Sequence, residues 1–552
     1  MRNKKLFFYI FIFFISLFLS LNHSFAVNII TNTTISSATT YDTLVVQSGA
    51  TLTINAALTI TGDALIEYGG VINHSQAGST SSNLIVGGTL TINPGGKYDV
   101  SGKGIASTGA GAQTVGATHG GYGYGASSKA PYGDIFNPTT VGSYGRNTSY
   151  PGGGLVRMTV GNLVNNGYIL ANGSNISRGQ GAGGSINITV NGNLSGTGIY
   201  QAKGGGISSY IGGGGRVAIR YNTVSSLATL KSKISAVGYS VAGEGTVYLK
   251  DLTTSYQILI IKGDGSDRGT STAVNLSDID EVILDGGGLS LIGSYPWNLT
   301  SSFSLNNGAF LTSNSTSPIT VSGTLSISSG CTLSTSGTLS VDNLLLYDGG
   351  VYNSSNSINI YSDLSLSGGT INSYSSLSIH NDLNLLSGAL NSYSSLSVLN
   401  NGVIKASSTL NNNSSFNVSG NLTIESGGII THNAVAASSS NLIVGGTLTI
   451  NPGGKYDVSG KGIASTGAGA QTVGATHGGY GYGSSKAPYG DIFNPTTVGS
   501  YGYNSSYPGG GLVRMTVGNL VNNGYILANG SNISRGQGAG GSINITVNGN
   551  LS

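Results

Sequence analysis

The sequence predicts an all-β protein, and more narrowly a parallel, right-handed β-helix that carries Gly/Tyr-rich loop insertions. Three observations lead there. Only 8% of the 552 residues are charged, against ~25% in ordinary soluble domains. The polar surface is Ser, Thr and Asn, which compete with helical hydrogen bonds, and 91 glycines are spread along the chain. Finally, short segments that alternate apolar and polar residues recur at regular spacing, as half-buried strands do.

The first 26 residues have the three parts of a secretory signal peptide: a basic start, an apolar run over residues 6–21 and small residues at Ser24-Phe25-Ala26. An uncleaved anchor helix is the alternative, although the run is near the short limit for crossing a bilayer. We therefore expect a secreted or cell-surface protein. Three of the 23 basic residues lie in this segment, so the exported chain has 20 basic and 20 acidic residues. A neutral chain gives no support for a nucleic-acid partner.

Entry coils of the β-helix are expected over residues 27–82, followed by a Gly-rich module over residues 83–250. Strand, turn and strand follow each other over residues 84–104, because Asn93-Pro94-Gly95-Gly96 is a turn sequence. A Gly/Tyr-rich insertion over residues 105–153 then interrupts the pattern. The strands that follow are predicted at residues 154–160, 184–190, 212–221 and 243–250.

The region 251–440 consists of short strands with a period of about 19–20 residues. Residues 372–379 recur at 391–398, an offset of 19, which is the size of one β-helix coil. A string of β-sandwich domains is the rival fold, but it would group about seven strands in each ~100 residues. The single Cys331 lies in such an alternating segment, and we interpret it as a small buried apolar residue.

A second copy of the module occupies residues 441–552, with its own insertion over residues 463–510. It differs from residues 83–195 at three places: Ala126 has no counterpart, Arg146 becomes Tyr503 and Thr148 becomes Ser505. The second copy stops where the first continues with Gly196-Thr197-Gly198. This stop predicts that the sequence is a fragment, and a genuine C-terminus is the alternative.

The order of motifs in the module resembles the Gly-rich modules of large bacterial secreted and cell-surface proteins with a pectin-lyase-like right-handed β-helix, of the adhesin or autotransporter-passenger type. The resemblance covers most of residues 83–250 and all of 441–552. It implies the fold and a surface location, and it implies no catalytic residues.

The two insertions are the candidate binding loops. Glycine lets the chain leave the stack and return without strain, and tyrosine offers a flat apolar face with a hydroxyl that suits sugars or protein surfaces. The alternative is a compact loop that packs its own tyrosines on the rod. The candidate binding residues are Tyr122, Tyr124, Tyr132, Tyr480, Tyr482 and Tyr489.

The sequence offers little that indicates catalysis. The His residues of the exported chain are isolated, and no Gly-x-Ser-x-Gly stands before a helix. Asp278 with Asp280, and Asp264 with Asp267, suggest calcium faintly, and solvated turn carboxylates are the preferred interpretation. We expect no catalytic residues, no metal site and no cofactor.

The expected function is therefore structural or adhesive, with an extracellular polysaccharide or a host or neighbouring cell surface as partner. A polysaccharide lyase or glycoside hydrolase on a pectin-lyase-like β-helix is the alternative, and a purely structural envelope or matrix component is a third possibility. Either enzyme would need carboxylates, or calcium with a basic residue, brought together on adjacent coils.

Overall fold

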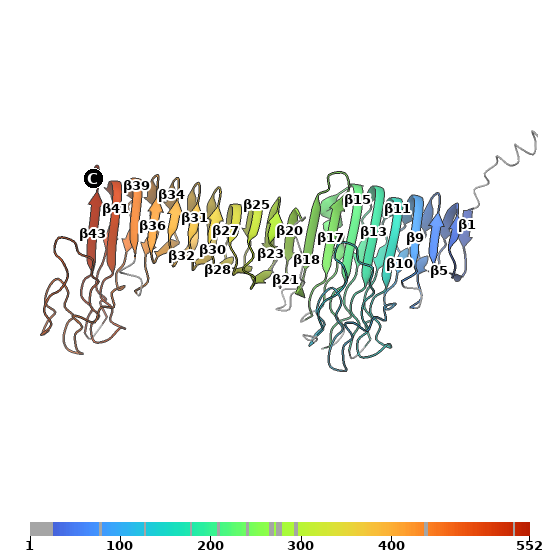
Figure 1. The fold of residues 1–552 in the computed structure, drawn as a ribbon, viewed down its shortest axis with the longest axis horizontal. Helices are drawn as coiled ribbons and strands as arrows, with labels where there is room; N and C mark the ends of the chain where they lie inside the picture. The colour runs from blue at the N-terminus through green and yellow to red at the C-terminus, as the bar shows by residue number, and fades with distance from the viewer. Residues whose placement is uncertain are drawn as a thin grey trace, which may run out of the picture. The chain divides into compact units, whose positions relative to one another are not determined.

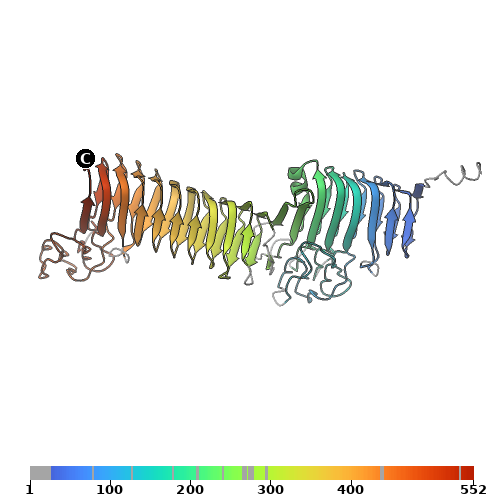
Figure 2. The same cartoon turned by 45° about the horizontal axis from the view of Figure 1, so that its top comes forward.

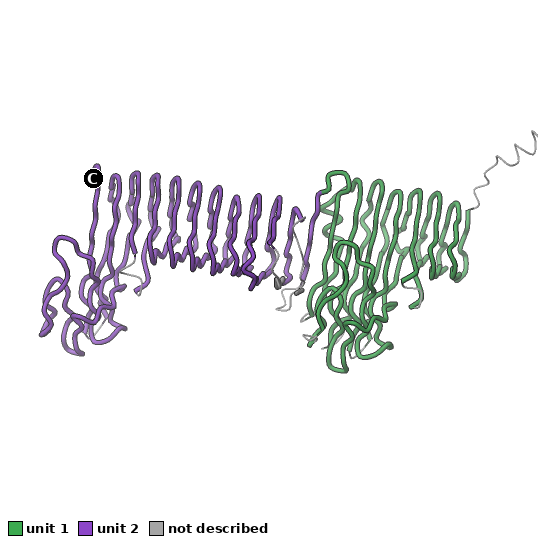
Figure 3. The backbone as a smooth tube through the Cα atoms, viewed as in Figure 1, with its two compact units in different colours: residues 1–255 green, residues 256–552 purple. Residues whose placement is uncertain are grey.

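The structure, a computed structural model, describes residues 26–76, 80–125, 129–176, 179–206, 210–238, 242–263, 270–271, 279–291, 296–434, 440–533 and 536–552. The predicted signal peptide therefore lies almost entirely outside the described residues. The chain divides into two compact units, Met1–Ser255 and Tyr256–Ser552 (Figure 3).

The first unit is a stack of parallel strands (Figure 1). Its strands are β1 (Ala26–Ile29), β2 (Thr33–Ile35), β3 (Thr39–Tyr41), β4 (Thr43–Val46), β5 (Thr51–Ile54), β6 (Ala57–Ile60), β7 (Ala64–Ile66), β8 (Val71–Asn73), β9 (Asn83–Ile92), β10 (Lys97–Asp99), β11 (Leu155–Asn165), β12 (Tyr168–Leu170), β13 (Ser185–Ser195), β14 (Ile199–Gln201), β15 (Arg216–Val224), β16 (Ile234–Ser235) and β17 (Thr246–Asp251). The strands β2, β5, β8, β10, β12, β14 and β16 form one sheet of their own.

Pairing runs from each coil to the next rather than along the sequence. Strand β3 pairs with β6, β4 with β7 and β5 with β8, always in parallel. Each strand therefore finds its hydrogen-bond partner one coil further on, which is the arrangement of a parallel β-helix. The predicted fold class is confirmed.

The second unit repeats this parallel, coil-to-coil pairing (Figure 1). Its strands are β18 (Gln257–Lys262), β19 (Thr270–Ser271), β20 (Glu281–Asp285), β21 (Gly288–Leu291), β22 (Trp297–Leu299), β23 (Ser302–Asn306), β24 (Phe310–Ser313), β25 (Ile319–Ile327), β26 (Thr332–Thr335), β27 (Leu339–Tyr347), β28 (Val351–Ser354), β29 (Ile358–Ile360), β30 (Leu364–Ser373), β31 (Leu377–Ile379), β32 (Leu383–Ser392), β33 (Leu396–Val398), β34 (Gly402–Ile404), β35 (Ser408–Asn412), β36 (Ser415–Val418), β37 (Leu422–Ile424), β38 (Ile429–Thr431), β39 (Asn441–Ile450), β40 (Lys455–Asp457), β41 (Leu512–Asn522), β42 (Tyr525–Leu527) and β43 (Ser542–Val547).

The core of each unit is a set of apolar columns. Alternate residues of a strand point inward, so the buried residues of successive coils lie above one another. In the second unit the register pairs Leu377 with Ile358 on one side and with Leu396 on the other, and all three are fully buried. The offset between Leu377 and Leu396 is the predicted 19 residues. Cys331 is also fully buried, as the alternation around it predicted.

One helix in the described chain was not predicted. It is α2 (Leu227–Lys233), which begins after Ser226, whose hydroxyl accepts a hydrogen bond from the Thr229 amide at 3.2 Å. A serine at this position satisfies an amide that has no partner inside the helix. Within the ranges given above, no helix is long and apolar enough to span a membrane.

Candidate functional site

The two insertions, called loop 1 (105–153) and loop 2 (463–510), lie beside the stacked strands of their own units (Figure 2). Loop 1 leaves the stack after β10 and returns to it at β11. It folds back so tightly that a Cβ atom on Gly145 would lie 1.5 Å from the carbonyl oxygen of Gly179. Glycine is therefore required there, because the backbone approaches another coil directly. The richness of the loops in glycine is explained by close packing of this kind.

His119 fastens loop 1 to the coil that leads into β13. Its Nδ1 lies 2.7 Å from the carbonyl oxygen of Gly183, and its Nε2 lies 2.9 Å from the Thr140 hydroxyl. A carbonyl can only accept, so Nδ1 carries the proton and Nε2 accepts from Thr140. Burial, and secondarily the charge of Arg216, lowers the pKa of His119 to about 3. The imidazole is thus neutral at any physiological pH.

Tyr132 is held by hydrogen bonds at both its side chain and its backbone. Its hydroxyl lies 2.7 Å from the Val141 carbonyl oxygen, to which it donates, and 2.8 Å from the Ser143 hydroxyl. Its ring packs at 4.7 Å from the His119 ring. Burial raises the pKa of the Tyr132 hydroxyl. Tyr132 therefore has a structural role in loop 1, because its hydroxyl makes its hydrogen bonds to other residues of the same loop.

Two arginines of β15, which pairs with β13, also hold loop 1. Arg216 is only 1% exposed, and its Nε donates to the Tyr132 carbonyl at 2.8 Å. Its Nη1 also donates to the Thr246 hydroxyl at 3.1 Å. Burial lowers the pKa of Arg216 to about 10, while the nearby Asp134 acts in the opposite direction. Arg216 therefore remains charged at neutral pH.

The second arginine, Arg220, donates from Nη1 to the Asn187 side-chain oxygen at 2.9 Å and from Nη2 to the Phe136 carbonyl. Next to this contact the Phe136 ring meets the ring of Tyr248 from β17 edge-on, at 5.0 Å. Loop 1 is consequently covered by β15 and β17, and the contacts are both polar and aromatic. Arg216 and Arg220 were not predicted from the sequence as residues that hold the loop. The available signal was their position as the only cations in an otherwise apolar strand, Gly-Gly-Arg-Val-Ala-Ile-Arg-Tyr.

The six predicted binding tyrosines fall into two groups. In loop 1, Tyr122, Tyr124 and Tyr132 are all partly buried against their own module. In loop 2, Tyr480 is 70% and Tyr482 is 89% exposed. The last, Tyr489, is half-buried and repeats the hydrogen bond of Tyr132, with its hydroxyl 2.7 Å from the Val498 carbonyl oxygen. Tyr480 and Tyr482 are the two that present an open ring.

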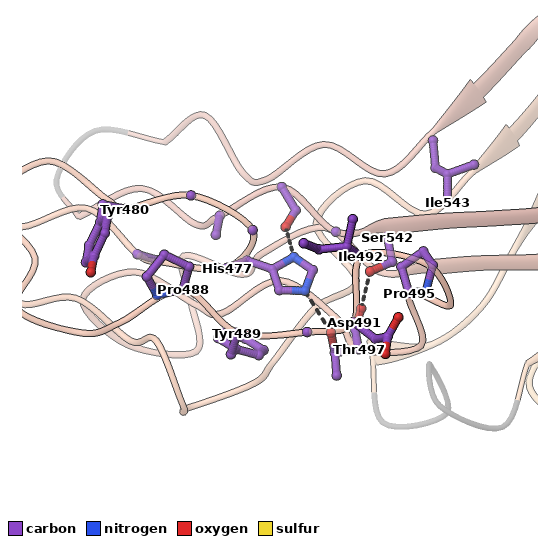
Figure 4. Close-up of a pocket in the computed structure, with 17 residues that line it drawn as sticks. His477, Tyr480, Pro488, Tyr489, Asp491, Ile492, Pro495, Thr497, Ser542 and Ile543 are labelled. Atoms are coloured by element: carbon purple, nitrogen blue, oxygen red, sulfur yellow. Dashed lines mark hydrogen bonds between the residues drawn. The ribbon is translucent and has the colours of Figure 1, made fainter.

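Loop 2 borders a cavity of about 740 Å³ that is open to solvent (Figure 4). His477, Tyr489 and Asp491 line one part of it, and Ser542 and Ile543 of β43 line another. His477 keeps both hydrogen bonds of its counterpart, to the Gly540 carbonyl and the Thr497 hydroxyl, each at 2.8 Å. The loop itself therefore has the same hydrogen bonds as loop 1, and the cavity lies between loop 2 and the start of β43.

A polar ladder runs along one face of the second unit. The side-chain amide of Asn372 donates to Asn353, and that of Asn391 donates to Asn372, both at 2.7 Å. Asn411 donates in turn to Asn391. At a neighbouring corner the exposed rings of Tyr374 and Tyr393 stack at 4.8 Å with an angle of 9° between their planes. Side chains of one kind are thus repeated from coil to coil on the outside.

The residues weighed for calcium give no assembled site in the described ranges. Asp264, Asp267 and Asp278 lie outside them. Asp280 is described, and its carboxylate accepts from the Gln257 amide at 2.7 Å and from the Thr300 hydroxyl. Among the residues that can be assessed, no three His, Cys, Asp or Glu side chains are grouped as metal ligands would be.

The fold and these surfaces define the class of protein, a parallel β-helix solenoid with loops packed against its side. In comparisons with known proteins, no family model matches the sequence, and no curated protein and no solved structure gives a significant match.

Proposed function

We propose that this protein is a secreted or surface-displayed β-helical repeat protein with a structural or adhesive role. In this proposal it binds an extracellular polysaccharide or a cell surface through the polar coil faces and the open tyrosines of loop 2. The observation that carries the proposal is the repetition of outward side chains along the second unit, in the ladder from Asn353 to Asn411.

The ladder suits an extended ligand because its chemistry repeats with the coils. Each asparagine that bridges two neighbours still has a second amide hydrogen and a second lone pair on its oxygen. A polymer lying along this face would meet the same donor and acceptor on every coil. Contacts that are weak singly then add together, because after the first contact each further one forms within a single complex.

The exposed aromatic rings add a second kind of contact. The stack of Tyr374 on Tyr393 and the open rings of Tyr480 and Tyr482 expose apolar faces that carry hydroxyls. Such rings bury apolar area against a sugar or a protein while their hydroxyls remain hydrogen-bonded. A polysaccharide or a glycan-rich surface is therefore the ligand class that we favour.

A polysaccharide lyase or glycoside hydrolase remains the alternative, and one grouping favours it. In the first unit Arg216 lies near Asp134 on one side and near His119 on the other. However, Arg216 is buried against loop 1 and His119 is a buried residue of that loop, and their hydrogen bonds are made to the loop and to the neighbouring coils. A polymer would have to displace the loop to reach them, so the grouping is better explained as a structural latch.

A binding assay combined with a product assay tests the proposal. The exported chain, residues 27–552, is incubated with a panel of insoluble plant and microbial polysaccharides, and the bound fraction and released sugar ends are both measured. We expect binding to at least one polysaccharide without release of reducing or unsaturated ends. Combined Asn372→Ala and Asn391→Ala should weaken this binding several-fold, and Asn187→Ala in the covered part of the first unit should leave it unchanged. Release of sugar ends, or no binding to any polysaccharide or cell surface, would refute the proposal.

A further inference from the structure

Tyr374 and Tyr393 occupy the same position in two successive coils of the second unit. They lie 19 residues apart, directly after β30 and β32 (Figure 1). These two strands pair in parallel, and their last residues, Ser373 and Ser392, lie opposite one another. Because neighbouring strands are spaced by ~4.8 Å, equivalent side chains of the two coils lie one above the other.

The chain turns in the same way after both strands. The amides of the two tyrosines donate to carbonyl oxygens of the preceding coil at 3.0 and 2.9 Å. The Ser373 hydroxyl donates to the Ser375 carbonyl oxygen at 2.9 Å. The Ser392 hydroxyl donates to the Ser394 carbonyl oxygen at the same distance. Because the two turns have the same hydrogen bonds, they hold the two tyrosines in the same orientation.

The two rings are stacked face to face and remain open to solvent. Their centroids lie 4.8 Å apart, and their planes differ by 9°. Tyr374 is 56% and Tyr393 is 40% exposed. Two other tyrosine pairs in the described part of the chain have centroids 6.3 Å apart and planes inclined by 57° and 68°. The pair of Tyr374 and Tyr393 thus combines a close, parallel approach with access from outside.

We propose that Tyr374 and Tyr393 form a site of oxidative cross-linking, at which a haem peroxidase with hydrogen peroxide joins the two rings into dityrosine. Each hydroxyl gives up one electron and one proton, and together these reduce one hydrogen peroxide to two water molecules. The unpaired electron of each phenoxyl radical is shared with the ring carbons next to the one that bears the oxygen. One such carbon from each ring forms the new C–C bond. The hydrogens on these two carbons leave as protons, and each phenolic oxygen takes up a proton again.

The register of the coils favours coupling within one chain. Because the two strands run in parallel and turn alike, the rings point the same way and their reactive carbons face one another. A partner held in place reacts as if it were present at a very high concentration. The bond ties two successive coils together and restricts the unfolded chain, as other cross-links do. This modification does not rest on polysaccharide binding, because it needs only the two rings and an oxidant.

The test oxidises the exported chain, residues 27–552, with a haem peroxidase and hydrogen peroxide. A parallel sample is oxidised with a ruthenium photo-oxidant and persulfate, which are small enough to reach rings that an enzyme does not. Dityrosine is measured by its fluorescence, and the linked peptides are identified by mass spectrometry after digestion. We expect one peptide with Tyr374 joined to one with Tyr393, two hydrogen atoms lighter than their sum. The product should be found in the monomeric chain, with a yield per chain that does not fall on dilution.

Conservative variants distinguish this site from general oxidation of exposed tyrosines. Tyr374→Phe and Tyr393→Phe keep the ring but remove the hydroxyl, so each should lower the dityrosine of the monomer ~10-fold or more. Tyr361→Phe is the matched control and should leave the yield unchanged, because Tyr361 is 52% exposed but its ring meets His380, at 5.1 Å. Hydrogen exchange between the two cross-linked positions should become slower in the oxidised chain and stay unchanged in oxidised Tyr393→Phe. Dityrosine confined to linked dimers, an equal yield in Tyr393→Phe, or no dityrosine with either oxidant would overturn the proposal.

Discussion

Acidification should open loop 1 through His119. The folded state holds this imidazole neutral with a pKa of about 3, whereas the unfolded chain has a pKa of about 6.5. The group therefore binds a proton more readily when the loop is open, so its contribution to stability is complete above pH 6.5 and is lost as the pH falls towards 3. At pH 5, which is about 1.5 below the pKa of the unfolded chain, the closed loop is less stable than at neutral pH by about 2 kcal/mol. This corresponds to a ~30-fold larger open fraction of loop 1.

Hydrogen exchange followed by mass spectrometry measures this opening directly. Protection factors of peptides within residues 105–125, corrected for the intrinsic pH dependence of exchange, should fall ~30-fold between pH 7 and pH 5. The control is His119→Asn, whose side-chain amide can still donate to the Gly183 carbonyl but cannot be protonated in this range. It should lower protection slightly at pH 7, because the Thr140 hydrogen bond is lost, and should show a much flatter pH dependence. The reasoning is refuted if the variant and the unmodified chain lose protection in parallel.

Three further changes test the packing. Arg216→Met should destabilise loop 1 by about 2–4 kcal/mol, because two hydrogen bonds from a buried cation are lost. Hydrogen exchange should then become faster in loop 1 and stay unchanged in loop 2. Equal acceleration in both loops would contradict this prediction. Phe136→Ala should lower the free energy of unfolding by about 1–2 kcal/mol, because the ring loses its contact with Tyr248 of β17. Its counterpart Phe493 is 97% exposed, so Phe493→Ala should change the free energy of unfolding by no more than about 0.5 kcal/mol. Similar thermal shifts for the two variants would show that loop 2 is covered. Leu377→Ala should lower the free energy of unfolding of the second unit by about 2–5 kcal/mol in a urea titration. The buried residues stacked on either side of Leu377 cannot move far enough to fill the cavity that the substitution leaves. A loss of less than about 1 kcal/mol would mean that the apolar column is not continuous.

The fold could be predicted from the sequence because the strands and the stacking of a β-helix both follow from patterns that repeat over short stretches of sequence. Alternation of apolar and polar residues decides which side chains point inward, and the 19-residue offset decides which coil stacks on which. The register between Leu377 and Leu396 follows from these two facts alone. The helix α2 was missed because its seven residues are too few to show a helical period.

The contacts of the loops could not be predicted because they join residues that are far apart in the sequence. Arg216 reaches Tyr132 across 84 positions, and His119 reaches Gly183 across 64. No periodic pattern relates such pairs, so the loops could be recognised as insertions without any indication of what they pack against. The asparagines of the ladder recur at the coil period, which the sequence shows. The side-chain hydrogen bonds between them could be inferred only once the stacking of the coils was known.

The duplication separates the effect of sequence from the effect of surroundings. Tyr122 and Tyr480 have the same neighbours in sequence, yet the first is partly buried and the second is largely exposed. Composition therefore cannot distinguish a binding tyrosine from a packing one in these loops, because the covering coil decides between the two roles. Loop 2 keeps the hydrogen bonds of His477 to Gly540 and Thr497 and of Tyr489 to Val498, so the loop is ordered by its own contacts. A loop that is already ordered loses little entropy when it binds a ligand.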